Sequence, residues 1–315
     1  MTMSKTLITV STDGQKKQYD RFIEDASDKA FLQAGLDKDK DGLQRLIGRG
    51  GEFQSSIIAT IKELSVSNRY ADEEVSSNYT YPPEYKGPKP IIDQITTLAK
   101  IFNLKPDSAI DYSETVPSLE SFVPADALAW TGWFAWIDYI ELGRQYFPKE
   151  KNLAVLYCLG VNLVLEKIKE SRPFYNHREG EIIESKLRLS SRTADAENVM
   201  RQTQKGPILI GAAQLGMRHG NPIARSVRRA RELFVPNEFG LGSLAVGSIA
   251  LTHPERFVRY EELDVDCAGD EFDFGDGRFF GAPCVYFFSD KVYFLAYEIS
   301  YAGSGCGAAS AFLPQ

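Results

Sequence analysis

The hydrophobic pattern of this chain changes its period near Gly206, and that change constrains the fold more than any other feature. Before it, apolar residues recur every three or four positions, as in amphipathic helices. The stretches with this spacing are 15–35, 52–66, 91–103, 126–147 and 151–171. After it, 206–216 is a continuous apolar run bounded by glycines, typical of a buried strand. The sequence therefore predicts an α+β protein, with a mostly helical N-terminal two-thirds and a β-rich C-terminal layer.

Strand signals continue to the C-terminus. Leu263 and Val265 alternate with acidic residues, and the runs CVYFF and KVYFLAYEI flank the dipeptide Ser-Asp at 289–290 as the strands of a hairpin would. A helix is expected at about 223–234, after the first strand. The glycine-spaced run at 240–251 fits a strand or a helix, because periodicity does not separate the two for a short apolar run.

A proline-rich stretch divides the helical part of the chain. SSNYTYPPEYKGPKP at 76–90 holds four prolines and no amphipathic period, so it should run extended, as a domain boundary or as a strap across the surface. A length of 315 residues leaves room for two or three domains. We therefore expect a helical region at 1–75, a linker at 76–90, a helical domain at 91–205 and a β-rich α+β domain at 206–315.

Charge and cysteine content indicate a cytoplasmic protein. Lys and Arg total 36 against 43 Asp and Glu, so the net charge of −7 does not draw the whole molecule to phosphate backbones or anionic membranes. The four cysteines form no CxxC pair and are interpreted as reduced thiols. The most apolar segment, 127–142, is interrupted by Asp138 and Glu141 and falls short of the roughly 20 apolar residues that cross a bilayer. We expect no membrane association and no cofactor.

Basic residues gather at 205–235, where six Lys or Arg accompany one acidic residue. The candidates for an anion or nucleic-acid site are Arg218, His219, Arg225, Arg228 and Arg229. The last three would share one face of a helix, and guanidinium groups pair well with phosphate oxygens. Without interleaved aromatic residues this signature is weak. We favour the other interpretation, in which the arginines pair with acidic residues 261–276 within the molecule or across an interface.

That acidic segment, EELDVDCAGDEFDFGD, holds eight carboxylates and no Lys or Arg. Such density usually means exposed turns, but unpaired carboxylates can also bind a hard metal ion or dock a basic partner. The candidate metal ligands are Asp264, Asp266, Asp270 and Glu271. Cys267 lies among these negative neighbours, which disfavour its thiolate, so no catalytic role is expected for it.

Two further motifs carry weaker signals. GSGCGAAS at 303–310 places Cys306 among small residues, loosely like a nucleophile elbow, but GxSxG is absent and a glycine-rich turn is the better interpretation. The segment from Asp37 to Gly42 matches the opening of a calcium loop. Its twelfth position is Gly48 instead of the bidentate Glu, so a solvated turn between helices is favoured.

Two stretches of the chain resemble segments that recur in uncharacterised bacterial proteins. They are STDGQKKQYDRFIEDASDKAFLQAGL at 11–36 and NEFGLGSLAVGSIALTHPERFVRYEELDVDCAGDEF at 237–272. That group has no assigned activity, so the resemblance transfers no functional residue. It implies a bacterial origin and a cytoplasmic location.

No segment carries a specific catalytic or cofactor motif, which favours a non-enzymatic protein that binds a partner or assembles with itself. Complementary basic and acidic segments suit such docking. The first alternative is a nucleic-acid-associated accessory protein that uses the arginines. The second is a hydrolase that uses Cys306 or a metal ion held by the acidic segment.

Overall fold

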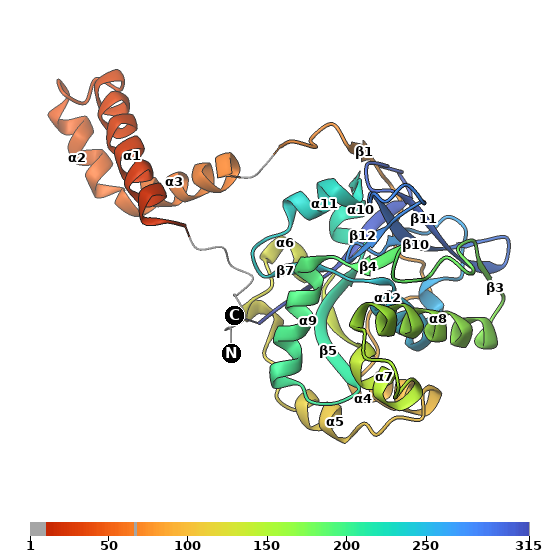
Figure 1. The fold of residues 1–315 in the computed structure, drawn as a ribbon. Coiled ribbons are helices and arrows are strands. Elements are labelled where there is room, and N and C mark those ends of the chain that lie inside the picture. Colours follow the sequence, from red (N-terminus) through yellow and green to blue (C-terminus); the bar gives the residue numbers. More distant parts are fainter. Residues whose placement is uncertain (1–10, 66–67, 315) are drawn as a thin grey trace. The chain divides into compact units, whose positions relative to one another are not determined.

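The chain divides into two compact units, which we call the N-terminal unit (Met1–Asn68) and the main unit (Arg69–Gln315). The computed structural model describes residues 11–65 and 68–314. Figure 1 shows their elements: the strands of the described residues all belong to the main unit. The helices lie mostly in the N-terminal part of the sequence and the sheet strands toward its C-terminus, so the α+β prediction is confirmed.

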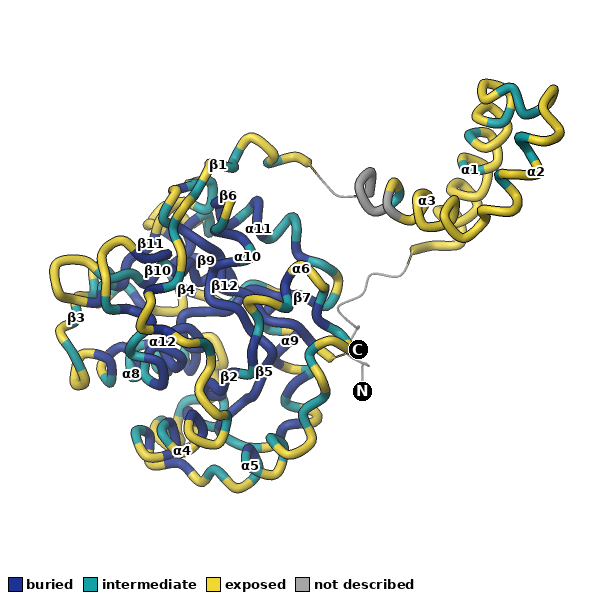
Figure 2. The backbone as a smooth tube through the Cα atoms, turned by 180° about the vertical axis from the view of Figure 1, so that it is seen from behind, coloured by how far each residue is buried: buried dark blue, intermediate teal, exposed yellow. Residues whose placement is uncertain are grey.

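Three helices make up the described part of the N-terminal unit: α1 (Asp13–Gln33), α2 (Lys40–Gly48) and α3 (Gly50–Ser65). Thr12 and Gln15 form a capping box at the start of α1. Asp39 accepts a hydrogen bond from the backbone N–H of Gly42, so this carboxylate of the calcium-like segment serves as a helix cap. No residue of this unit whose burial is described is buried, as the yellow and teal tube of Figure 2 shows.

The main unit is built on a ten-stranded mixed sheet. Its strands are β2 (Gly132–Ile137), β3 (Phe174–Asn176), β4 (Leu187–Leu189), β5 (Ile208–Leu215), β7 (Glu238–Gly240), β8 (Asp264–Asp266), β9 (Asp270–Phe272), β10 (Gly281–Phe288), β11 (Lys291–Glu298) and β12 (Cys306–Phe312). The main path runs β2-β5-β12-β8-β10-β11-β3. β12 is parallel to β8, and β11 is parallel to β3, while the other pairs are antiparallel. The predicted strand at 206–216 and the predicted hairpin are confirmed by β5 and by β10 with β11.

Helices and a second, two-stranded sheet surround this core. The helices are α4 (Ile91–Ile101), α5 (Asp107–Ser113), α6 (Ala125–Leu128), α7 (Tyr139–Tyr146), α8 (Leu153–Ser171), α9 (Ser191–Thr203), α10 (Met217–Gly220), α11 (Val227–Leu233) and α12 (Ser243–Thr252), with short 3-10 turns at Leu119–Ser121 and Pro254–Arg256. The second sheet pairs β1 (Glu74–Ser76) with β6 (Ile223–Arg225). α12 packs against α8 and β2 and is buried along nearly its whole length, so the undecided run at 240–251 is mostly a helix.

The predicted single helix at 126–147 is wrong. Its residues form the end of α6, the strand β2 and the helix α7. β2 pairs with β5, and Trp136 packs over Gly211, where a Cβ would lie 2.2 Å from the tryptophan ring. A strand buried on both faces is apolar at nearly every position, so its hydrophobic pattern does not distinguish it from a buried helix.

Residues 91–205 and 206–315 do not form separate domains. β2, β3 and β4 come from the first range and pair with β5, β11 and β9 of the second within one sheet. Both ranges belong to the main unit. The change in periodicity near Gly206 is real, but long-range strand pairing crosses it.

The proline-rich stretch at 76–90 is a strap along the main unit. Its extended backbone is tied down at several points: Leu263 donates its backbone N–H to the carbonyl of Thr80 at 3.0 Å, and Lys89 donates its backbone N–H to Nε2 of His253 at 2.9 Å. The boundary between the two units falls before this stretch. Of the two interpretations of the prolines, the strap is the one that the structure supports.

Candidate ligand-binding site

Strand register gathers acidic and aromatic side chains on one face of the sheet. Residues two apart on a strand face the same way, and directly paired residues share a face. Asp264 of β8 pairs with Cys306 of β12, and Asp266 pairs with Cys284 of β10. Tyr286 lies two residues beyond Cys284, so it faces the same side as both aspartates.

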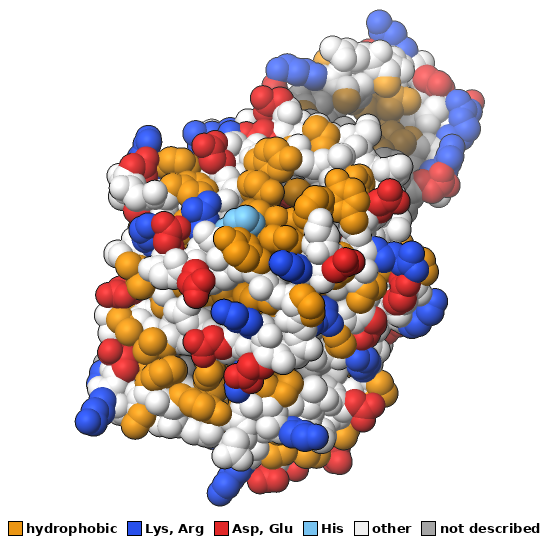
Figure 3. Space-filling model, turned by 90° about the vertical axis from the view of Figure 1, so that its right-hand side faces the viewer, with side chains coloured by type: hydrophobic (Ala, Val, Ile, Leu, Met, Phe, Trp, Pro, Cys, Tyr) orange, Lys and Arg blue, Asp and Glu red, His pale blue; other side chains and the backbone are white. Residues whose placement is uncertain are grey.

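Aromatic residues continue this face across β11. Tyr286 pairs with Tyr293, and their rings stack with centroids 5.1 Å apart. Tyr293 also contacts His177 and Tyr175, with centroid distances of 5.5 and 5.8 Å. Figure 3 shows hydrophobic side chains gathered around a histidine on one face of the molecule. His177 is exposed, whereas His219 and His253 are buried. This aromatic surface was not foreseen from the sequence.

A pocket of about 370 Å³ is cut into this face. The lining residues are Tyr79, Tyr260, Glu262, Asp264, Tyr286, Phe287, Phe288, Tyr297, Tyr301, Gly303, Ser304, Gly305 and Cys306. They come from β8, β10, β11, the start of β12 and the loops beside them, and none of them is Lys, Arg or His. The volume falls within the range of small-molecule sites, about 300–1,000 Å³.

Glu262 brings a buried carboxyl to the pocket. Its side chain is only 2% exposed, and neither oxygen makes a hydrogen bond of good geometry to a described residue. Nη1 of Arg256 lies 3.9 Å away, while Nη2 donates to the carbonyl oxygens of Leu215 and Leu263. Burial raises the pKa of Glu262 to about 7, against the opposing effects of Arg256 and nearby backbone N–H groups. Burying a carboxyl without full hydrogen bonding is costly unless a partner is supplied.

Asp264 is the second acid of the pocket. Its backbone is fixed by a hydrogen bond to the carbonyl of Gly305, 2.7 Å long, but its carboxyl has no hydrogen bond to a described residue. Burial raises the pKa of Asp264 to about 8, the charge of Asp266 raises it further, and Arg256 acts in the opposite direction. Acids with pKa values displaced in this way, set in a cleft, are a recognised mark of functional sites.

Cys306 lines the pocket without being prepared as a nucleophile. Burial raises the pKa of its thiol well above the ordinary value, and the charges of Asp266 and Asp264 add to this. The reactive form of cysteine is the thiolate, so this thiol is poorly reactive at neutral pH. Cys306 is the first residue of the buried strand β12, so the predicted glycine-rich turn covers only the residues before it.

The four predicted metal ligands are put to separate uses. Asp264 lines the pocket, Asp266 is buried in the sheet, and Asp270 accepts a hydrogen bond from the backbone N–H of Ser243 at 2.7 Å. Glu271 forms an ion pair with Arg188 at 2.8 Å. Within residues 11–65 and 68–314, no group of three or more His, Cys, Asp or Glu side chains is placed to hold a metal ion.

The predicted basic helix at 223–234 begins later than expected. Residues 223–225 form β6, which pairs with β1, and Ser226 then caps α11 by accepting the backbone N–H of Arg229. Arg225 therefore lies on a strand, and the three arginines do not share a helix face. The pairing of β6 with β1, distant in sequence, overrides the local helical spacing.

These arginines are engaged by carboxylates of the main unit. Arg228 pairs with Glu73, and Arg225 and Arg229 pair with Glu74 at 3.2 and 2.7 Å. Internal pairing is the interpretation that we favoured, but these partners come from β1 and the residue before it, and not from the acidic segment 261–276. A phosphate backbone would have to compete with them for the guanidinium groups.

Arg218 and His219 are also enclosed. Nε2 of His219 lies 3.0 Å from Oε1 of Glu238, and Ser310 donates its hydroxyl to the same oxygen at 2.6 Å. Arg218 lies within ion-pair distance of Glu238 and of Asp126, at 3.3 and 2.8 Å. Burial lowers the pKa of His219 despite its carboxylate partner. The structure therefore uses these two residues inside the fold, and none of the five basic candidates reaches the pocket.

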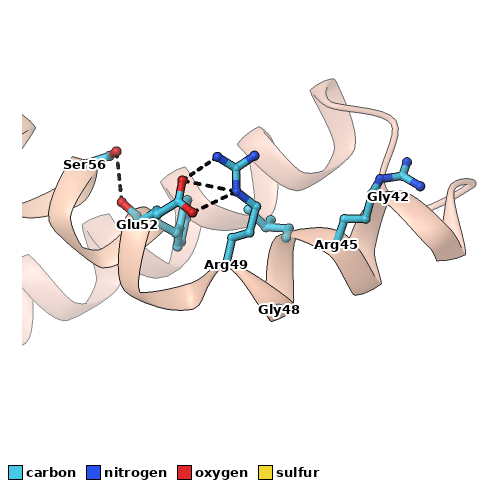
Figure 4. A pocket seen from close by; sticks show the side chains of 8 residues that line it. Gly42, Arg45, Gly48, Arg49, Glu52 and Ser56 are labelled. Atoms are coloured by element: carbon cyan, nitrogen blue, oxygen red, sulfur yellow. Dashed lines mark hydrogen bonds and ion pairs between the residues drawn. The ribbon is translucent and has the colours of Figure 1, made fainter.

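The N-terminal unit holds a second hollow, of about 740 Å³, between α2 and α3 (Figure 4). Its charged residues pair with neighbours: Nε of Arg49 donates to Glu52 at 3.1 Å, and Arg45 lies 3.6 Å from Asp39. Ser56 donates its hydroxyl to the backbone carbonyl of Glu52. No residue that lines this hollow has a buried polar side-chain atom without a hydrogen-bond partner, so we assign it no ligand.

No family model, curated protein or solved structure matches this chain. In the described residues, no helix combines the length and the apolar character that a bilayer crossing requires. The fold and the site define an α+β protein whose mixed sheet carries an acidic pocket lined by tyrosines.

Proposed function

We propose that this chain is a binding protein and that the pocket on its mixed sheet holds the ligand. The observation that carries this proposal is the pair of carboxyls, Glu262 and Asp264, placed among aromatic rings with no cationic side chain in the lining. Desolvating these acids costs folding free energy, which a ligand that pairs with them would offset. Buried carboxyls with so few hydrogen bonds are more typical of binding sites than of structural cores.

The chemistry of the lining favours recognition over catalysis. Burial raises the pKa of the Cys306 thiol, so the lining offers no prepared thiolate nucleophile. Burial raises the pKa of Tyr286 to about 12, so this phenol also keeps its proton. What remains is a set of aromatic faces, phenol hydroxyls and two acids, which supports binding of a small molecule.

A thermal-shift and calorimetric screen of small organic solutes, grouped by charge, tests the proposal. At least one group is expected to raise the unfolding midpoint and to bind with one-to-one stoichiometry. Tyr301→Ala should weaken this binding about fivefold or more, since it removes a ring of the pocket. Tyr175→Ala is the matched control, because both tyrosines are 51% exposed but only Tyr301 lines the pocket. Absence of binding in every group, or binding that Tyr301→Ala leaves unchanged, would refute the proposal.

A further inference from the structure

We infer that the pocket selects organic cations: the amine or alkylated ammonium group of a small molecule, held against tyrosine rings with its charge facing Glu262 and Asp264. This inference rests on the binding function proposed above and names the chemical class of its ligand. It stands on three observations: the placement of the rings, the charge of the lining, and two carboxyls that accept no hydrogen bond of good geometry from a described residue.

Aromatic rings reach the pocket from several parts of the chain. Tyr297 and Tyr301 have centroids 5.1 Å apart with their planes tilted by 33°, and Tyr260 meets Phe288 edge to face, also at 5.1 Å. Tyr286 adds a further ring from β10. The face of an aromatic ring attracts a cation, and several rings around one position are the arrangement with which proteins recognise quaternary ammonium groups.

The charge of the lining excludes other ligand classes. A phosphate or carboxylate would approach Glu262 and Asp264 with no lining Lys, Arg or His to offset the repulsion. Arg256 is fully buried and does not line the pocket: its Nη2 donates to two backbone carbonyls, and its Nη1 lies 3.9 Å from Glu262 within the fold. A neutral ligand would fill the pocket but would bring no charge to pair with the two carboxyls. A cation supplies the ring contacts and the missing partner together.

The neighbourhood of the two acids makes the binding dependent on pH. The titratable and charged groups that act on them or line the pocket with them are Glu84, Arg172, Arg256, Arg259, Asp266, Cys284, Cys306, Tyr79, Tyr260, Tyr286, Tyr297 and Tyr301. The pKa values of both thiols and of three phenols, those of Tyr286, Tyr297 and Tyr301, are raised, so these groups stay protonated. The carboxyls are therefore the groups that titrate near neutral pH. A cation favours the ionised carboxylates, so it should bind more tightly as pH rises and should release protons.

Isothermal titration calorimetry of the full chain with two probes tests this. Choline carries a trimethylammonium group, and 3,3-dimethyl-1-butanol is its neutral isostere. Choline is expected to bind at least about tenfold more tightly than the isostere, and about tenfold more tightly at pH 8.5 than at pH 6.0. Proton release is measured by repeating the titration in buffers of different ionisation enthalpy.

A substitution at one of the two acids, Asp264, locates the effect. Asp264→Asn keeps the shape of the side chain and removes its charge, and no hydrogen bond to a described residue is lost with it. We expect it to weaken choline binding about tenfold at pH 8.5 and to remove most of the pH dependence. Glu261→Gln is the control, because Glu261 is the exposed neighbour of Glu262 and does not line the pocket.

The outcomes separate this inference from the function on which it rests. Equal affinities for choline and its isostere, both reduced by Tyr301→Ala, would overturn the cation class and leave the binding function intact. So would failure of choline to bind while other solutes bind in a Tyr301-dependent way. Choline binding that Asp264→Asn does not change would also overturn the inference. If no solute of any class binds, the inference and the proposed function fall together.

Discussion

At Asp264 the folded chain holds a proton that the unfolded chain releases at a lower pH. The folded pKa is about 8, and the ordinary value is about 3.9. Between these values the folded state binds more protons, so the free energy of unfolding falls as pH rises and levels off above about 8. Asp264→Asn cannot titrate. In urea unfolding at pH 5, 6.5 and 8.5, the free energy of unfolding of the wild type should therefore fall with rising pH by about 1 kcal/mol or more relative to that of this variant.

Asp276 provides the control for that series. It is exposed, and its hydrogen bond with Arg278 holds its pKa below the ordinary value, so its contribution is lost only at acidic pH. The difference between wild type and Asp276→Asn should stay flat from pH 5 to 8.5. If Asp264→Asn is equally flat, Asp264 is ionised in the folded state and the electrostatic description of the pocket is wrong.

Single residues of the pocket could be picked out from the sequence, but the residues that surround them could not. Asp264 and Cys306 were candidates, as parts of a metal site and of a turn. The tyrosines could have been found: the predicted hairpin places Tyr286 and Phe288 on one face of its first strand, and Tyr293 opposite Tyr286. The position of β8 between β12 and β10 could not, since it depends on pairings between distant segments. Nor does composition tell which acids of 261–276 fold inward.

At the scale of elements, Asp270 joins three of them. From β9 it accepts hydrogen bonds from Tyr157 of α8 at 2.5 Å and from the backbone N–H and hydroxyl of Ser243, the first residue of α12. Asp270→Ala would leave these buried donors unsatisfied, so we expect a loss of about 3 kcal/mol in urea unfolding. Asp276→Ala removes an exposed carboxylate and should cost far less than Asp270→Ala. Similar losses for both would mean that Asp270 is not a structural centre.

Elements were predictable where one face is buried and the other is wet. The helices near 91–103 and 151–171 follow from amphipathic spacing, which depends on local sequence alone. β2 and α12 are buried on several sides, so their apolar residues do not mark one face of the element. In both cases contacts with distant segments determine the secondary structure: β2 pairs with β5, and α12 packs against α8.

The ion pairs that tie α11 and β6 to the region of β1 are expected to serve stability. Arg229 has a side chain that is 8% exposed and pairs with Glu74 and Glu232, at 2.7 and 2.8 Å. Arg229→Ala leaves both carboxylates without this partner, so it should lower the free energy of unfolding by about 1–3 kcal/mol. Arg278→Ala, at an exposed pair, should change it by less than about 0.5 kcal/mol.

The same arginines decide the nucleic-acid alternative. Arg225→Ala and Arg228→Ala are expected to leave the fluorescence anisotropy of labelled single- and double-stranded DNA and RNA unchanged at low and near-physiological salt, since the guanidinium groups are already paired. Folded variants that bind these probes more weakly than the wild type, with a smaller dependence on salt, would contradict this and favour a nucleic-acid-associated protein.

The two units of the molecule differ in how far the burial of apolar side chains offsets the free-energy cost of folding. The main unit buries a continuous core between its sheet and helices. The N-terminal unit buries no residue whose burial is described, and it exposes large apolar side chains such as Phe22, Leu32 and Ile47. Helical periodicity showed that these helices exist. It could not show that none of their residues with a described burial is buried, because an amphipathic pattern does not say what covers the apolar face.

This difference predicts which part of the chain folds by itself. A chain that begins at Arg69 keeps the sheet, the strap and every lining residue of the pocket. Its urea midpoint should match that of the full chain, and it should bind the same solutes with affinities within about twofold. Residues 1–68 alone should show little cooperative unfolding by circular dichroism, because isolated helices without tertiary packing are marginal in water. Loss of folding or of binding in the shortened chain would mean that the main unit depends on the N-terminal helices, and the pocket would then have to be assigned to the whole molecule.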